Sequence, residues 1–181
     1  VLQAFLEFCL NYTFLIHFNG NRFDIPYLQQ KCSMYEIPFM FEVYQGIDLY
    51  KRIKPYKSFL KLNDLKQKTL EQFLGIYRDD KFSGGELINY YHDYVCSHDE
   101  ELMNAILLHN QEDVEGMLDL TAILAFTDLF NLPLRVMKVQ ANYYNDYENK
   151  KRQELVLNLR FMTPLPVPVS FASMGCYFTG N

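Results

Sequence analysis

The sequence lacks long apolar runs, internal repeats and low-complexity segments. Its apolar stretches are short and interrupted, as in "VLQAFLEFCL" at residues 1–10, and none approaches the roughly 20 residues that cross a bilayer. These first residues also lack the basic start and the small-residue cleavage site of a signal peptide. We therefore expect no membrane helix. Since Val1 rather than Met opens the chain, we interpret the sequence as a fragment that begins inside a domain.

Cysteine is also scarce, with four residues spread over the chain at Cys9, Cys32, Cys96 and Cys176. None of them forms a C-x-x-C pair, which argues against a zinc knuckle or a redox dithiol. We expect reduced, mostly buried thiols and a cytoplasmic location.

The chain has no overall positive charge, because 17 Lys and Arg stand against 22 Asp and Glu. The net charge of -5 argues against a protein that coats nucleic acid non-specifically. Residues 1–134 hold 11 basic and 19 acidic side chains, a net of -8, whereas residues 135–181 hold 6 and 3, a net of +3. With 49% hydrophobic residues, we predict one domain at 1–134 and an appendage at 135–181.

One stretch within the acidic part is strongly basic, "KRIKPYKSFLKLNDLKQK" from Lys51 to Lys68. It holds seven Lys and Arg against one Asp, interleaved with Tyr56 and Phe59. Cations mixed with aromatic rings suit contact with phosphates and stacking on the bases of a single strand. A solvated helix face with its preceding loop fits the spacing at least as well.

Periodicity predicts helices and strands in alternation near the start of the chain. A helix over residues 2–11 precedes a strand in "YTFLIHF" and a turn at Asn19-Gly20. Asp24 suits the N-cap, and Pro26 the first turn, of a helix that runs to Pro38. A second strand is predicted at residues 39–50.

The remainder of the chain predicts three more helices and a hairpin. The helices cover residues 62–76, where Gly75 suits the C-cap, then 84–96 and 99–130. Two alternating runs around a charged turn between residues 136 and 171 predict a β-hairpin that ends in a proline-rich extended piece.

Asp24 has a structural and a functional interpretation. In the structural one, Asn19-Gly20 makes the turn and Asp24 caps the helix that Pro26 starts. In the functional one, a carboxylate near the carboxyl end of a strand lies where open α/β sheets place their ligands. One carboxylate there binds a divalent cation only weakly.

The stretch "LLHNQEDVEGM" is a second candidate. His109 and Asp113 are four residues apart, on one helix face beside the apolar stripe. They form either a surface His–Asp pair or, together with Asp24, the constellation that metal-assisted phosphodiester cleavage requires. Two other features are left open: Asp48 either assists this site or caps a turn, which we favour, and Arg78 either pairs with Asp79 or contacts a nucleic-acid backbone.

The succession "FNGNRFDIPYL", "DLY", "KTLEQFLGIYRDD", "ELINYYHDY" and "HNQEDV" resembles the ribonuclease-H-like exonuclease domains of the DEDD superfamily, most closely the YprB-like group. The similarity spans roughly Val1 to Phe130, and the order of the motifs carries most of the weight. It implies a metal-dependent exonuclease that acts on DNA or RNA, from the 3′ end by analogy.

The resemblance also implies roles for individual residues. Asp24 and Asp113 correspond to family metal ligands, and carboxylates suit Mg²⁺ or Mn²⁺. His109 stands where the family usually has a Tyr that orients or deprotonates the attacking water, and a His with a near-neutral pKa can take that proton. Asn19 would lie close to the substrate strand.

One family motif has no counterpart in this sequence. An Asp-x-Glu is expected on the first strand, yet Glu7 is the only acid before Asp24. Without two of four anionic ligands, we expect this chain to be inactive or nearly so. Missing first strands would also expose a sheet edge and apolar surface, so we expect self-association.

The sequence thus predicts an α/β ribonuclease-H-like domain that lacks its N-terminal strands, with a small C-terminal β-rich extension from about Arg135. The competing hypothesis is a non-catalytic module that binds nucleic acid or a protein through the basic stretch. Its predicted contacts are Lys51, Arg52, Lys54 and Lys57. A purely structural domain is the third and weakest hypothesis.

Overall fold

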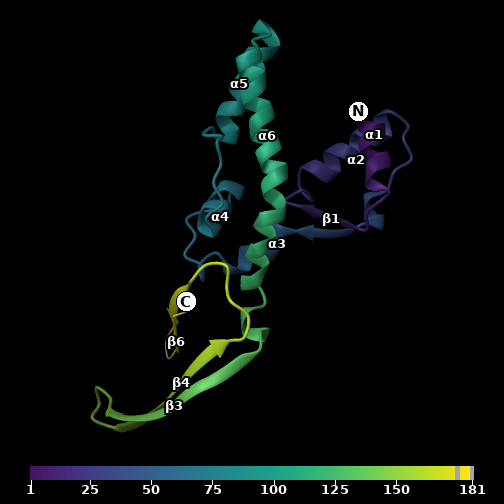
Figure 1. The fold of residues 1–181 in the computed structure, drawn as a ribbon. Helices are drawn as coiled ribbons and strands as arrows, with labels where there is room; N and C mark the ends of the chain where they lie inside the picture. Colours follow the sequence, from purple (N-terminus) through teal and green to yellow (C-terminus); the bar gives the residue numbers. More distant parts are fainter. Residues whose placement is uncertain (174–175, 180–181) are drawn as a thin grey trace.

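The computed structural model describes residues 1–173 and 176–179, and these form a mixed α/β arrangement (Figure 1). The helices are α1 (Leu2–Cys9), α2 (Asp24–Met34), α3 (Leu49–Ile53), α4 (Gln67–Leu74), α5 (Gly84–Ser97) and α6 (Glu100–Leu120). The strands are β1 (Phe14–His17), β2 (Gln45–Asp48), β3 (Leu134–Asn145), β4 (Lys151–Phe161), β5 (Ser170–Ser173) and β6 (Cys176–Thr179). Short 3₁₀ helices are η1 (Phe41–Val43), η2 (Lys54–Tyr56), η3 (Thr121–Phe126) and η4 (Leu129–Asn131).

The α/β character comes from a parallel pair of short strands joined through α2. β1 pairs with β2 from Phe14 opposite Gln45 to His17 opposite Asp48. The second strand is shorter than predicted, because residues 41–43 turn into η1 before it begins. Since β2 leads directly into α3, the carboxyl ends of both strands lie at the start of that helix.

The Asn-Gly turn after β1 forms as predicted. Asn19 has a left-handed φ of 57°, and the Gly20 N–H donates to Nδ1 of His17 at 3.1 Å. A Cβ on Gly20 would lie 2.9 Å from that nitrogen, so only glycine fits there. The predicted cap is wrong by one residue: Phe23 is the N-cap, and Asp24 begins α2 without a side-chain capping bond.

The later helices follow their end signals. Gly75 closes α4 with a left-handed φ of 78°, as predicted, and Ser83 and Glu86 form a capping box at the start of α5. The helix predicted to reach residue 130 instead ends at Leu120 and continues as η3. α5 packs along α6 as an antiparallel helical pair (Figure 1).

The main hydrophobic core lies under α3, α4 and the end of α6. Its buried members are Leu49, Ile53, Leu60, Leu70, Leu120, Ile123, Phe126 and Val169. A smaller cluster of Leu6, Cys32 and Phe41 holds α1 and α2 together. The larger core therefore fixes the base of α6, the helix that carries His109 and Asp113.

The predicted C-terminal hairpin is confirmed as the antiparallel pair β3–β4, which reaches away from the helices (Figure 1). A register shift between Val136 and Lys138 marks a bulge. Cross-strand neighbours on one face are apolar and exposed: Val136, Val139, Ala141, Leu155, Leu157 and Leu159. Within the described part of the chain, no helix is long and apolar enough to cross a membrane.

Candidate functional site

α6 presents His109 and Asp113 to a pocket of about 1080 Å³. The two side chains are one helical turn apart, with His109 Nε2 3.4 Å from Asp113 Oδ2. α4, the loop after it and the start of α5 form the opposite wall, and Phe18, the residue after β1, also lines the pocket. The cations around it are Lys66, Lys68, Arg78 and Lys81.

Asp80 is the buried centre of one half of this site. Its side chain is 0% exposed, and Oδ2 lies 2.5 Å from both Lys68 Nζ and His109 Nδ1. Oδ1 accepts the Phe82 N–H at 2.8 Å. Burial alone would raise the pKa of this carboxyl, but the hydrogen bonds from Lys68, Phe82 and His109 outweigh it and lower the pKa to about 2. Asp80 is therefore an anion at neutral pH.

Arg78 is the centre of the other half. Its side chain is 7% exposed, its Nη2 lies 2.6 Å from Asp113 Oδ1, and it bonds Glu71 through Nε and, at 2.7 Å, through Nη2. Burial disfavours the charged guanidinium, but these two carboxylates raise its pKa above the ordinary value. The suggested pairing of Arg78 with Asp79 is wrong, because Arg78 bridges Glu71 and Asp113 instead.

Neighbouring groups hold the two halves against α6. Gln67 Nε2 donates to Glu71 Oε1 at 3.0 Å and to the Asp113 carbonyl at 2.9 Å. The Glu112 carboxylate accepts the N–H groups of Asp79 and Asp80 at 2.8 and 2.9 Å. A Cβ on Gly116 would lie 3.0 Å from Glu71 Oε1, so glycine in mid-helix makes room for that carboxylate.

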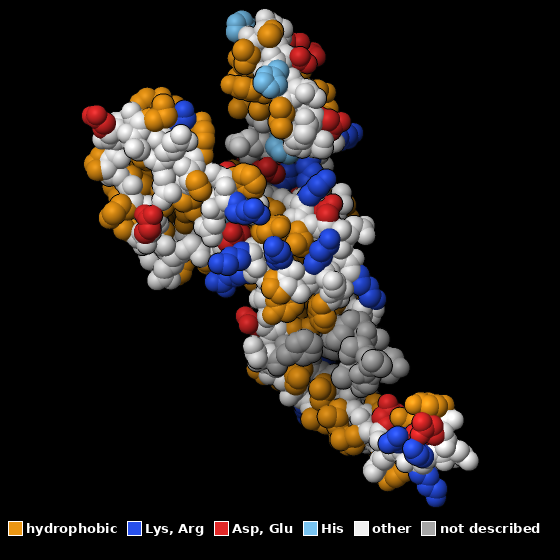
Figure 2. Space-filling view, turned by 180° about the vertical axis from the view of Figure 1, so that it is seen from behind, with side chains coloured by type: hydrophobic (Ala, Val, Ile, Leu, Met, Phe, Trp, Pro, Cys, Tyr) orange, Lys and Arg blue, Asp and Glu red, His pale blue; other side chains and the backbone are white. Residues whose placement is uncertain are grey.

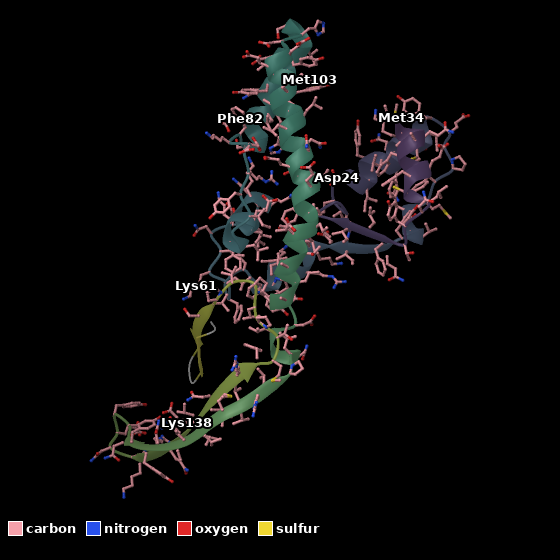
Figure 3. The ribbon with its side chains drawn as sticks, viewed as in Figure 1. Asp24, Met34, Lys61, Phe82, Met103 and Lys138 are labelled. Atoms are coloured by element: carbon pink, nitrogen blue, oxygen red, sulfur yellow. The ribbon has the colours of Figure 1, made fainter. Side chains whose placement is uncertain are left out.

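Asp24 lies elsewhere, at the exposed start of α2. In Figure 3, Asp24 is labelled at one end of α2, the end that lies nearer to α6 in this view. It makes no hydrogen bond or ion pair within residues 1–173, but its charge acts on the buried His17. Burial lowers the pKa of His17, and the charges of Asp48 and Asp24 oppose this without reversing it.

Asp48 caps the start of helix α3 rather than the turn that was favoured from the sequence. Its Oδ1 accepts the Lys51 N–H at 3.2 Å and the Asn19 N–H at 3.0 Å. Asn19, a predicted substrate contact, is thus held through its backbone at the carboxyl ends of β1 and β2. The Nε2 of His17 is buried and has no hydrogen-bond partner among the described residues.

The cations of the basic stretch differ in how far they are exposed and paired. Lys51, Arg52 and Lys54 are exposed on α3 and η2, whereas Lys57 is half-buried. Lys68, at the far end, is taken up by Asp80 and the Phe82 carbonyl. Figure 2 shows Lys and Arg side chains gathered over the middle of the molecule.

Sequence reasoning found His109 and Asp113 but missed the groups that hold them. Lys68, Glu71 and Asp80 all lie in "KTLEQFLGIYRDD", a stretch that carries the family resemblance, but no role in this site was predicted for any of them. Glu71 is 1% exposed and a buried acid needs a partner, but an acid beside Leu70 in an amphipathic helix does not reveal that burial in the sequence.

The described residues do not make a complete site for two divalent ions. No group of three or more His, Cys, Asp or Glu side chains able to hold a metal occurs among them. Asp113 already binds a guanidinium through Oδ1. Of the two predicted metal ligands, Asp113 lines the pocket beside His109, whereas Asp24 is not among the residues that line it.

The sequence model of the RNase_H superfamily matches residues 1–125, more than half of the chain. This chain therefore belongs to the RNase_H superfamily. Its members are nuclease-like, bind nucleic acid and generally use divalent metals. No curated protein and no solved structure matches the chain significantly.

Proposed function

We propose that this chain is the nuclease domain of a metal-dependent exonuclease of the DEDD type, closest to the YprB-like group, that acts on DNA or RNA from the 3′ end. The observation that supports this best is the face of α6 formed by His109 and Asp113. This face opens onto a pocket rimmed by cations, next to Phe18 at the carboxyl end of β1. Open α/β sheets place their ligands at that edge.

The proposal gives one role to His109 and a second, shared role to Asp24 and Asp113. His109 takes a proton from the attacking water, and Asp24 and Asp113 supply the carboxylates for Mg²⁺ or Mn²⁺. When bound, such ions supply charge stabilisation at the phosphate. Because the described residues lack a complete ion site, we expect this chain by itself to hydrolyse phosphodiesters slowly or not at all.

Mn²⁺ titration by calorimetry tests the carboxylate roles. We expect weak binding that falls at least tenfold in Asp24→Asn and in Asp113→Asn, each of which keeps the side-chain shape. Asp119→Asn, an exposed change on the same helix, is the control and should bind as the unsubstituted chain does. Equal affinity in all four proteins would refute the assignment of Asp24 and Asp113.

A second candidate function is nucleic-acid binding without catalysis. It is favoured by Lys51, Arg52 and Lys54, which are exposed and form no ion pair within the described residues. Asn19 and Lys57 are the remaining proposed contacts. Fluorescence anisotropy with single-stranded DNA and RNA should show a salt-dependent affinity. That affinity should drop several-fold in the triple variant in which Lys51, Arg52 and Lys54 are changed to Gln. An affinity that responds to Asp24→Asn but not to the triple change would favour the first function.

Self-association and cytoplasmic location are also proposed. β1 and β2 form a two-stranded sheet whose outer edges pair with no other strand of the described residues, and Phe14 and Ile16 on β1 are exposed. Exposed strand edges favour pairing between copies. We expect a molecular mass by light scattering that rises with protein concentration, and a constant monomer mass would contradict this. The free thiols of Cys9, Cys32 and Cys96 suit a reducing compartment.

A further inference from the structure

We propose that Asp80 is a positioning residue for His109: it holds the imidazole as the Nδ1–H tautomer, so that Nε2 is the nitrogen that accepts a proton in the pocket. This inference rests on the proposed role of His109 as the base. Asp80 lies 29 residues before His109 in the sequence, at the end of the stretch "KTLEQFLGIYRDD", and the sequence assigned no role to it.

The argument begins with the donor and acceptor capacity of the two groups. His109 Nδ1 lies 2.5 Å from Asp80 Oδ2. An ionised carboxylate can only accept hydrogen bonds, so the proton between these atoms belongs to Nδ1. In a neutral imidazole the other ring nitrogen, Nε2, then carries the lone pair.

Asp80 itself cannot turn away from His109. Lys68 Nζ lies 2.5 Å from the same Oδ2, and the Phe82 N–H occupies Oδ1. Lys68 is in turn anchored by the Phe82 carbonyl. With a side chain that is 0% exposed, Asp80 has no water to exchange for these partners. The geometry thus fixes both the tautomer and the orientation of the imidazole.

The other ring nitrogen, Nε2, lies on the Asp113 side of the imidazole. Nε2 lies 3.4 Å from Asp113 Oδ2, and both residues line the pocket. When the water oxygen forms its bond to phosphorus, its proton passes to Nε2. The bond from phosphorus to the leaving oxygen breaks, and that oxygen keeps the electron pair and takes a proton from solvent. The resulting imidazolium donates from Nδ1 to Asp80 and lies beside the Asp113 carboxylate, which stabilises its charge.

The same molecule contains the opposite tautomer as an internal reference. His17 Nδ1 accepts the Gly20 N–H at 3.1 Å, so a neutral His17 must carry its proton on Nε2. The structure therefore assigns Nδ1–H to His109 and Nε2–H to His17.

Nitrogen-15 NMR of the histidine rings distinguishes the two tautomers without any catalytic activity. In the unsubstituted chain, at a pH where the rings are neutral, His109 should show a protonated Nδ1 and a bare Nε2. His17 should show the reverse. His109→Gln and His17→Gln assign the signals. An Nε2–H form of His109 would overturn the proposal, whatever the outcome of the Mn²⁺ and nucleic-acid experiments.

Two substitutions then test the cause. Asp80→Ala removes the acceptor, so the proton should move to Nε2, which has the Asp113 carboxylate as its nearest acceptor. Asp79→Asn makes the same change of charge at the exposed neighbour and should leave the Nδ1–H form intact. A proton that stays on Nδ1 in Asp80→Ala would show that Asp80 does not hold it. Should that variant fail to fold, the spectrum of the unsubstituted chain decides.

Discussion

Asp113 and Asp24 are the two proposed metal ligands, yet the structure gives them opposite surroundings. Asp113 is bonded to the buried Arg78 and lies beside His109, on a helix fixed by the main core. Asp24 is exposed at a helix start and has no hydrogen-bond partner in the described part of the chain. One carboxylate therefore contributes to the stability of the fold, whereas the other is free to bind a ligand.

The largest effect should come from removing the cation beside Asp113. Arg78→Met leaves Glu71, which is 1% exposed, as a buried charge without its main partner. We expect the free energy of unfolding to fall by about 3–5 kcal/mol in urea denaturation. Lys150→Met, which breaks the exposed pair with Glu148, is the control and should cost less than about 1 kcal/mol. Similar losses in the free energy of unfolding in both variants would show that the buried pair contributes no more to stability than the exposed pair.

The next effect depends on pH. The pKa of Asp80 is about 2 in the folded chain and about 3.9 in an unfolded one, so its carboxylate stabilises the fold above about pH 4. That contribution is lost as the pH falls toward 2. The difference in free energy of unfolding between the unsubstituted chain and Asp80→Asn should therefore shrink by about 2 kcal/mol between about pH 5 and pH 2. Curves that stay parallel would contradict the ionised, bonded state of Asp80.

A smaller effect on stability should distinguish substitutions at two glycines, Gly116 and Gly85. Gly116→Ala would place its Cβ 3.0 Å from Glu71 Oε1, a carboxylate that Arg78 holds in place. We expect destabilisation by about 1 kcal/mol despite the better helix propensity of Ala. Gly85→Ala in α5 has its nearest neighbouring atom at 4.0 Å and should be neutral or stabilising. Thermal unfolding compares the two, and a stabilised Gly116→Ala would show that Glu71 is free to move.

The smallest effect should come from Asp24. Asp24→Asn removes neither a capping bond nor an ion pair, so the free energy of unfolding should change by less than about 0.5 kcal/mol. Because the Asp24 charge raises the pKa of His17, that pKa should fall slightly further in the variant. NMR titration of His17 measures this. A large loss of stability would mean that Asp24 is as integral to the fold as Asp113.

Much of the fold could be predicted because its signals are local. The Asn19-Gly20 turn, the C-cap at Gly75 and the hairpin after Pro133 each depend on a few adjacent residues. Helix boundaries were less certain, and the cap that Asp24 was expected to provide belongs to Phe23.

The candidate site could be predicted only in part for the same reason. His109 and Asp113 share one helix face at a spacing visible in the sequence. Asp80 contacts both Lys68 and His109 only because the irregular loop after α4 folds back on α6. No periodicity describes such a loop, and the adjacency of Arg78 and Asp79 suggested a pair that tertiary contacts do not form.

The hairpin of β3 and β4 has a practical consequence for anyone who handles this chain. One side of the ribbon is a strip of water-exposed Val and Leu, with no second layer of the described chain against it. Sulfate and phosphate strengthen the tendency of such a strip to leave water. The unsubstituted chain should thus precipitate at a lower ammonium sulfate concentration than a variant in which Val139 and Leu157 are both changed to Thr.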